Sequence, residues 1–316
     1  MSDTKAKPIR LGLVGLGKIA RDQHLPAIAL TDDIELVAVA SRNATLEGVA
    51  CFPTIDALLA SDVEVDAISL CTPPQGRRAQ VAAAIAAGKH VMIEKPPGAS
   101  TSEIPPLAAL AEQAGVTLFA TWHSRYAPAV EPARKWLAER TIRSVLVQWK
   151  EDVRHWHPGQ DWIWEPGGFG VFDPAINALS IVTRILPRPF ALESATLDVP
   201  SNRDQPVAAE LSFTDTIGTP IRAELDFLQT GPQSWDIHVD TDNGMLTLSG
   251  GGKLMTHNGR VMLDAHEAEY RGLYRQFVSL VGRGESDVDI SPLAHVADAF
   301  MLGRRRTVAP FDWNPA

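Results

Sequence analysis

Asp173 and Lys95 are two candidate proton-exchanging side chains in this sequence, and each stands where a fold can fix it. Asp173 directly precedes Pro174 and an apolar helical segment, a pattern typical of a helix N-cap followed by proline at the first helical position. Because the helix N-terminus favours the charged form, we expect a depressed pKa for Asp173 and an ionised carboxylate able to accept a proton. Asn177 lies four residues on, and so on the same helix face. A capping role alone could explain an aspartate at position 173, although an N-cap does not require a polar partner such as Asn177 one turn on.

Lys95 belongs to the segment Glu94-Lys95-Pro96-Pro97, which follows the apolar run His90–Ile93. Proline restricts the backbone, so this loop can hold the ammonium group in one place, and one of its two X-Pro bonds is a candidate for the cis form. An ordinary exposed ion pair is the competing interpretation of Glu94 and Lys95. To accept a proton, Lys95 would have to be neutral, which requires burial or a cationic neighbour.

A glycine-rich turn near the amino terminus predicts a dinucleotide site. The segment Gly15-Leu16-Gly17-Lys18-Ile19-Ala20 follows the apolar run Ile9–Val14 and opens a helix-like segment. In such a motif Gly15 permits the tight turn, Gly17 lets the backbone approach a pyrophosphate, and the small Ala20 lets helix and strand pack closely. The free N–H groups at the start of the helix then face the anion.

The end of the second predicted strand favours NADP over NAD. Glu35–Ala40 ends without the Asp or Glu that binds the ribose 2′-hydroxyl in NAD-preferring domains, whereas Ser41 can donate a hydrogen bond and Arg42 can pair with a 2′-phosphate. Acceptance of both coenzymes stays open, and a solvated Arg42 is the competing interpretation. Ligands of open parallel sheets bind beyond the carboxyl ends of the strands, which adds the loops after the third and fourth strands. The candidate cofactor-binding residues are Gly15, Gly17, Lys18, Ile19, Ser41, Arg42, Cys71, Thr72, Pro73, Glu94 and Lys95.

Two segments of different character must position these residues. Up to about residue 121, apolar strands alternate with helices, which predicts an α/β domain (1–121) with a Rossmann parallel sheet. Residues 122–316 predict an α+β domain for substrate binding and oligomerisation, with a large open-faced antiparallel sheet. The expected strands are Ile9–Gly15, Glu35–Ala40, Val65–Leu70, His90–Ile93, Thr117–Ala120, Ser144–Val153 and a series between residues 190 and 263 that includes Ala208–Phe213, Ile221–Leu228, Trp235–Val239 and Met245–Leu248. The expected helices are Ile19–Leu30, Ile55–Leu59, Gln75–Ala87, Glu103–Ala114, Val130–Glu139, Pro174–Leu186, Glu267–Val281 and Pro292–Leu302, with Gly88 and Gly115 at two C-termini.

The overall composition narrows the class of protein. The chain has 316 residues and a net charge of −9, which argues against nucleic acid or an anionic membrane as a partner. Two cysteines offer neither a disulfide framework nor metal-ligand spacing, which suits a cytoplasmic protein. The polar start Met1–Lys7 predicts a short disordered leader and no signal peptide, and no apolar run approaches membrane-spanning length.

Four tryptophans gather within sixteen residues, at 149, 156, 162 and 164. Aromatic faces pack against apolar surfaces, including those of a sugar ring, and nearby polar groups could bind hydroxyls. For Trp149, on a strand, a place in the core is the favoured interpretation, whereas Trp162 and Trp164 flank a loop rich in glycine and proline where burial is harder. His155 and His157 lack a third ligand at a sensible spacing, so we expect no metal.

Several long segments resemble the Gfo/Idh/MocA oxidoreductase family over essentially the whole chain, and most closely its bacterial branch of L-arabinose and D-galactose 1-dehydrogenases. They are Gly17–His24, Trp122–Arg125, Trp149–Arg154, Trp156–Gln160 and Gly170–Ser180. The resemblance implies NAD(P)-dependent oxidation of a monosaccharide, L-arabinose, D-galactose or D-fucose, at C1 to the lactone. Residues then expected to contact the substrate are Lys95, His123, Glu151, Trp156, His157, Trp164, Asp173, Asn177 and Trp235.

The resemblance also bears on catalysis. Many family members carry a histidine where this chain has Asn177, and asparagine cannot exchange protons, so the histidine mechanism does not transfer. Asp173 and Lys95 remain as alternative proton acceptors. The branch resemblance supports Asp173 with Asn177 as the catalytic pair, Lys95 orienting the C1 oxygen.

Other functions stay open. They are oxidation of another sugar or polyol, aldose–aldose oxidoreduction, and non-catalytic cofactor-dependent regulation, which the presence of both Lys95 and Asp173 disfavours. An open antiparallel sheet would leave an apolar face for a second subunit, so we expect a homodimer.

Overall fold

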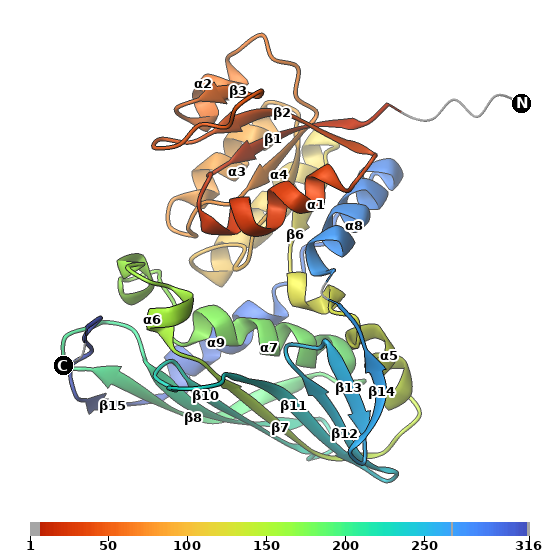
Figure 1. Ribbon diagram of the computed structural model, residues 1–316, viewed down its shortest axis with the longest axis vertical. Helices are drawn as coiled ribbons and strands as arrows, with labels where there is room; N and C mark the ends of the chain where they lie inside the picture. Colours follow the sequence, from red (N-terminus) through yellow and green to blue (C-terminus); the bar gives the residue numbers. More distant parts are fainter. Residues whose placement is uncertain (1–6, 267, 315–316) are drawn as a thin grey trace, which may run out of the picture. The chain divides into compact units, whose positions relative to one another are not determined.

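The computed structural model describes residues 7–266 and 268–314 (Figure 1). Within that part the chain packs as two compact units, one of residues 7–123 with Tyr270–Ile290, the other of Ser124–Glu269 with residues 291–314. Apart from Lys7, the predicted leader lies outside the described residues, as does Glu267, the predicted first residue of a helix. The domain boundary at residue 121 stays a prediction, and the packing adds a late segment to the first unit.

The first unit contains a six-stranded sheet in the order β3-β2-β1-β4-β5-β6, with every pair parallel. This order is that of a Rossmann domain, so the predicted fold class is confirmed. The strands are β1 (Ile9–Val14), β2 (Ile34–Ala40), β3 (Ala50–Phe52), β4 (Ala67–Leu70), β5 (His90–Ile93) and β6 (Leu118–Ala120). The sequence did not predict β3, which has three residues and none of them buried.

Helices connect these strands close to their predicted positions. They are a π-helical turn (Ala20–His24), α1 (Leu25–Ala29), α2 (Ile55–Leu59), α3 (Arg77–Ala86), a 3₁₀ turn (Thr101–Glu103) and α4 (Ile104–Ala114). Gly88 and Gly115 have φ of 71° and 65°, which confirms the left-handed residues predicted at two helix ends.

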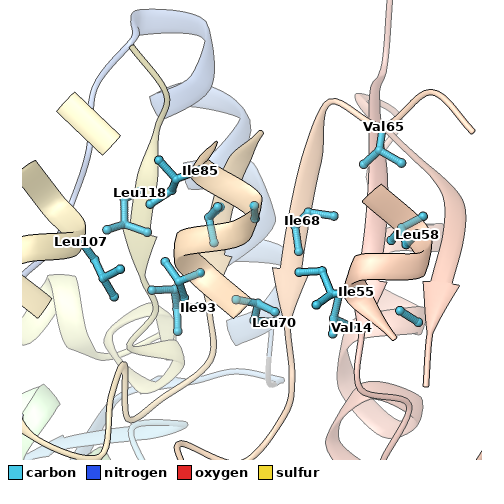
Figure 2. Packing of buried hydrophobic residues seen from close by; sticks show 14 of the residues in the cluster. Val14, Ile55, Leu58, Val65, Ile68, Leu70, Ile85, Ile93, Leu107 and Leu118 are labelled. Atoms are coloured by element: carbon cyan, nitrogen blue, oxygen red, sulfur yellow. The ribbon is translucent and has the colours of Figure 1, made fainter. Parts of the chain in front are cut away.

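The core on one face of this sheet joins strands and helices (Figure 2). Ile68 of β4 and Ile93 of β5 are fully buried, and Leu58 of α2, Ile85 of α3 and Leu107 of α4 pack with them. Parallel strands that are buried on both faces are expected to be almost continuously apolar. Their burial in this core explains why the sequences of β4 and β5 are almost continuously apolar.

Helix α8 (Glu269–Arg283) packs in the first unit from Tyr270 onward, beside β6 in Figure 1. The ring of Phe277 stacks on Phe119 with centroids 6.4 Å apart. Just beyond the helix, the Ser286 hydroxyl accepts a hydrogen bond from the Leu118 amide at 2.9 Å. The sequence had grouped this helix with the second segment because no local pattern records which sheet a helix will cover.

The second unit is a nine-stranded sheet in the order β14-β13-β12-β11-β7-β10-β9-β8-β15. Its strands are β7 (Ile142–Lys150), β8 (Phe190–Pro200), β9 (Ala208–Asp215), β10 (Pro220–Asp226), β11 (Ser234–Thr241), β12 (Gly244–Ser249), β13 (Leu254–His257), β14 (Arg260–Asp264) and β15 (Arg304–Val308). The expected wholly antiparallel sheet is wrong at two places, because β10 pairs with β7 and β15 with β8 in parallel. Since β15 follows a helix, the chain can return in the same direction, which a hairpin does not allow.

Helices cover one face of this second sheet, and the opposite face carries none among the described residues (Figure 1). The helices are a 3₁₀ turn (His123–Tyr126), α5 (Val130–Leu137), α6 (Val153–Trp156), a 3₁₀ turn (Asp161–Trp164), α7 (Phe172–Ile185) and α9 (Ser291–Leu302). No helix in the described part of the chain is both long and apolar enough to cross a membrane.

The open face is polar, so the expectation of an apolar face is wrong. Along β7 and β10 the buried residues alternate with Leu146 and with polar side chains, namely Ser144, Gln148, Lys150, Arg222, Glu224 and Asp226. Lys150 and Glu224 form an ion pair of 2.7 Å across the two strands. Period-two alternation places these polar groups toward solvent, which removes the physical basis given for a dimer. The dimer itself stays a prediction.

Candidate active site

The turn after β1 has the geometry that the glycine motif predicts. Gly15 has φ of +92°, and a Cβ there would lie 3.0 Å from backbone atoms of Cys71 and Thr72, so the predicted tight turn is confirmed. A Cβ at Gly17 would meet nothing within 4 Å among the described residues. The backbone is therefore open at the position where a pyrophosphate has to approach, and the fully buried Ala20 lets the next helix pack closely.

Ser41 and Arg42 directly follow β2, at the same edge of the sheet. The Ser41 amide donates to the Phe52 carbonyl at 2.9 Å, which fixes the start of the loop. Arg42 is exposed, and within the described residues its guanidinium has no hydrogen bond or ion pair. Lys18, by contrast, pairs with Asp22 one helical turn on. Arg42 is thus an exposed cation beyond the carboxyl end of β2, and its pairing with a 2′-phosphate stays a prediction.

Arg77, which the sequence analysis missed, joins the loops that follow β4 and β5. The residue is 2% exposed, and its guanidinium donates hydrogen bonds to the carbonyls of Thr72, Glu94 and Pro96. Beside it, the amide of Gln75 is buried with no hydrogen-bond partner in the described residues. Such an unsatisfied amide fits a polar ligand at this edge, which agrees with a bound dinucleotide. The only sequence signal for Arg77 was a charge opening an alanine-rich helix.

Glu94 holds the backbone of Lys95 from within the core. One carboxylate oxygen of Glu94 accepts from the Lys95 amide at 2.7 Å, and the other accepts from Tyr270 Oη at 2.7 Å and lies 3.2 Å from His24 Nε2. The far ring nitrogen of His24 lies 2.7 Å from Tyr274 Oη. Glu94 is 4% exposed, so the interpretation as an exposed ion pair is wrong. The Lys95–Pro96 bond is cis, as predicted for one of the two bonds.

Burial and charge act in opposite directions on this network. Burial alone would raise the pKa of Glu94, but the hydrogen bond and charge of His24 lower it to about 2. Burial alone would lower the pKa of His24, and the acidic groups Cys71, Tyr274 and Glu94 raise it well above its ordinary value. The two side chains therefore form a buried ion pair behind Lys95. His123 belongs to the same unit and stacks on Tyr270, with centroids 5.1 Å apart.

In the second unit, Asp173 lies at the second position of α7 and is not its N-cap. The cap is Val171, whose amide donates to the Pro206 carbonyl at 2.8 Å, and the helix begins at Phe172. The N-cap prediction is wrong because the preceding turn, with Gly170 at φ of 52°, starts the helix two residues early. Asp173 is still in the first turn, and Asn177 shares its face one turn on.

Three of the predicted substrate residues, His157, Glu151 and Trp235, form a chain of contacts that ends at Asp173. Its Oδ2 lies 3.9 Å from His157 Nδ1, and His157 Nε2 lies 3.6 Å from Glu151 Oε1. Glu151 Oε2 in turn accepts a hydrogen bond of 2.8 Å from the indole of Trp235. Glu151 comes from the end of β7, His157 from the end of α6 and Trp235 from β11. The structure thus assembles a chain of two buried carboxylates with one imidazole between them.

Aromatic rings surround this chain. Trp235 lies 5.0 Å from Trp156 and 5.9 Å from Trp149, centroid to centroid. Trp149 is 4% exposed, which confirms its predicted place in the core. Trp164 is also buried, at 3%, so the argument that its loop would keep it out of the core is wrong. Its contact with substrate stays a prediction, and Trp156 is the half-buried indole nearest to Trp235.

The carboxyl-terminal segment packs against the tryptophan-rich loop, a contact that the sequence did not suggest. Phe311 lies 4.7 Å from the ring of Trp164, and the indole of Trp313 donates to Asp161 Oδ1 at 2.8 Å. The guanidinium of Arg154 lies over Phe311 at 5.0 Å. The carboxyl-terminal segment thus holds the tryptophan-rich loop at two positions, Asp161 and Trp164. In the described chain no three His, Cys, Asp or Glu side chains cluster so as to hold a metal ion.

Comparison with known proteins supports the Rossmann assignment and extends it to the whole chain. The family GFO_IDH_MocA, an oxidoreductase family with an NAD-binding Rossmann fold, matches residues 9–121. The chain is 49% identical to galactose 1-dehydrogenase of Pseudomonas fluorescens over 308 residues, which is 96% of this chain and 99% of that protein. The crystal structure of D-galactose-1-dehydrogenase from Rhizobium etli superposes with a TM-score of 0.95 at 55% identity, over 98% of this chain and 100% of that one. KijD10, a 3-ketoreductase from Actinomadura kijaniata solved with NADP and TDP-benzene, shares the fold at a TM-score of 0.83 and 21% identity, over 96% of this chain and 100% of its own.

Proposed function

Because the chain belongs to the Gfo/Idh/MocA oxidoreductase family, we propose that it oxidises D-galactose at C1 to the lactone, with a nicotinamide dinucleotide as hydride acceptor. The near full-length likeness to two galactose 1-dehydrogenases is the observation on which this proposal depends. L-Arabinose and D-fucose share the ring-hydroxyl configuration of D-galactose at C2, C3 and C4. We therefore expect both to be substrates as well.

Each site residue has a role in this reaction. Asp173 accepts the proton of the C1 hydroxyl, Lys95 orients the C1 oxygen, and Asn177 holds a ring hydroxyl by hydrogen bonding. The buried position of Asp173 in the first turn of α7 supports its role, since the helix N-terminus favours the carboxylate. The indoles of Trp156 and Trp235 offer faces for the sugar ring. His123, Glu151 and His157 provide further polar contacts.

The dinucleotide is held at the carboxyl edge of the parallel sheet. The open backbone at Gly17, the exposed Arg42 and the unsatisfied amide of Gln75 support this placement. When bound, its nicotinamide supplies the acceptor for the hydride that leaves C1. We propose NADP as the preferred coenzyme because Arg42 stands where an acidic residue would select NAD. Two free cysteines agree with a cytoplasmic location.

A spectrophotometric assay tests the proposal. NADPH and NADH formation would be followed with D-galactose, L-arabinose, D-fucose, D-glucose and two polyols, and the lactone would be identified by mass spectrometry. We expect the first three sugars to have the highest kcat/KM, and D-glucose, the C4 epimer of D-galactose, to be poor. Oxidation of the polyols without the aldoses would contradict the proposal and favour a polyol dehydrogenase.

A further inference from the structure

The proposed reaction leaves a proton on a carboxylate that has little access to water. The side chain of Asp173 is only 5% exposed. Its neighbour on the helix face, Asn177, cannot take up or release a proton. Each turnover must nevertheless return Asp173 to its ionised form, so the site needs a group that takes the proton from it and can reach solvent.

His157 stands in that position. Its Nδ1 lies 3.9 Å from Asp173 Oδ2, while the side chain itself is 20% exposed, four times as much as that of Asp173. The ring packs against Phe227 at 5.6 Å, which limits its rotation. The distance exceeds a hydrogen bond, as is common in catalytic pairs before substrate binds.

Glu151 orients the imidazole toward this task. Its carboxylate is 3% exposed and is anchored by Trp235, and its backbone amide donates to the Asp226 carbonyl at 2.9 Å. Glu151 Oε1 lies 3.6 Å from His157 Nε2, closer than Asp173 Oδ2 lies to Nδ1, so we assign the hydrogen of the neutral ring to Nε2 and the lone pair to Nδ1, on the side of Asp173. A buried carboxylate that fixes the tautomer and stabilises the imidazolium plays the same part in the Ser-His-Asp triad.

We infer that His157 is the proton carrier of this site, a role that rests on the proposed function. The C1 hydroxyl proton passes to Asp173 Oδ2 as the hydride leaves C1, and then from Oδ2 to His157 Nδ1, giving an imidazolium between two carboxylates. Loss of a proton from the imidazolium to solvent restores neutral His157 and ionised Asp173. The proton count and the charge of the site balance over one turnover, because each sugar oxidised releases one proton to solvent and both side chains return to their starting state. A histidine from another element thereby supplies the proton exchange that Asn177 cannot.

The inference is tested by substituting His157 and then adding free imidazole to the assay of the variant. In His157→Ala we expect kcat for D-galactose to fall about 100-fold at saturating sugar and coenzyme. Added imidazole should restore part of kcat in a saturable way, and the solvent deuterium isotope effect on kcat should rise in the variant. His155→Ala is the matched control, because His155 is exposed two residues earlier in the chain and, among the described residues, its ring contact is with Trp156 alone, so it should keep the wild-type kcat.

A structural or hydrogen-bonding role would give a different result. His157→Asn keeps a polar group near Asp173 but cannot carry a proton, so wild-type kcat in this variant would overturn the inference, as would kcat within twofold of wild type in His157→Ala. Loss of kcat in His157→Ala that no concentration of imidazole restores would overturn it too. If the wild-type protein oxidises no aldose, the proposed function fails instead, which these measurements on variants do not decide.

Discussion

At the scale of single residues, the proposed chemistry depends on the asparagine at position 177 and the carboxylate at position 173. Asparagine can hold a sugar hydroxyl but cannot exchange a proton, so the proposed base is Asp173. The structure gives that carboxylate the first turn of α7, near-complete burial and His157 as neighbour. These surroundings differ from those of an exposed cap, which would be solvated and unpaired.

Substitution of Asp173 by Asn should lower kcat for D-galactose by about 10² to 10⁴-fold, because the amide cannot accept the proton. Binding of NADP, measured by fluorescence titration, should stay within twofold. Asp56→Asn is the control, since Asp56 occupies the same second position of helix α2 but is exposed. A fall in kcat of less than tenfold in Asp173→Asn would remove Asp173 as the base.

Substitution of Arg42 by Ala should raise KM for NADP by about 10-fold or more, because a charge-assisted hydrogen bond to phosphate contributes about 1.5–3 kcal/mol. KM for NAD should change little, since NAD lacks the 2′-phosphate. Each coenzyme thus serves as the control for the other in steady-state kinetics. Equal effects on both would show that Arg42 does not bind the 2′-phosphate.

Sequence reasoning could nominate Asp173, Asn177 and His157, because their types and spacing are visible along the chain. It could not find the pairing of Glu94 with Tyr270 and of His24 with Tyr274, since these partners lie 176 and 250 residues apart. It also misjudged Trp164, because the aromatic partner Phe311 comes from the far end of the chain.

At the scale of elements, Arg77 at the start of α3 holds two loops together. We expect Arg77→Met to leave the carbonyls of Thr72, Glu94 and Pro96 without this donor. The variant should lose about 1–3 kcal/mol of stability in urea unfolding and should bind NADP more weakly, because both loops belong to the proposed cofactor edge. Arg78→Met is the control, as Arg78 is adjacent and exposed. Equal behaviour of the two variants would contradict a role for Arg77 in fixing the loops.

Local signals predicted most elements of the first unit, because helix ends there carry glycines in the left-handed conformation and the strands are continuous apolar runs. The short strands β3 and β15 escaped prediction, since β3 has only three residues, too few to show a period, and β15 is largely exposed and begins with three arginines. Strand direction in the second sheet was also misjudged. Whether β10 pairs in parallel with β7 depends on the path of the chain through α7 and two further strands, which periodicity does not record.

At the scale of the whole molecule, the buried pair of His24 and Glu94 should make stability depend on pH. Because the pKa of Glu94 is lowered to about 2, its contribution is present above the unfolded value near 4.5 and is lost as pH falls toward 2. Because the pKa of His24 is raised, its contribution is present below about 6.5 and is lost as pH rises through the folded value. Stability from this pair is therefore largest between about pH 4.5 and 6.5.

Substitution of Glu94 by Gln should remove the acid side of this dependence. The lowering of the Glu94 pKa from 4.5 to about 2 corresponds to on the order of 3 kcal/mol of unfolding free energy. The unfolding free energy of wild type should therefore fall more steeply than that of the variant between about pH 4.5 and 2. Urea unfolding at several pH values would measure this. Glu35→Gln, an exposed change on β2, should follow the wild-type slope. Parallel curves for wild type and Glu94→Gln would contradict the buried ion pair.

The return of α8 to the first unit has a consequence for how the protein is made. The ribosome releases residues 7–123 early, yet Tyr270 and Tyr274, which close the space around His24 and Glu94, emerge only after strands β7 to β14 of the second sheet. Until then, His24 and Glu94 have each other but lack the two tyrosine hydroxyl groups that complete their hydrogen-bond network in the folded unit. Completion of the coenzyme-binding half is in this way a late event of synthesis, although that half begins the chain.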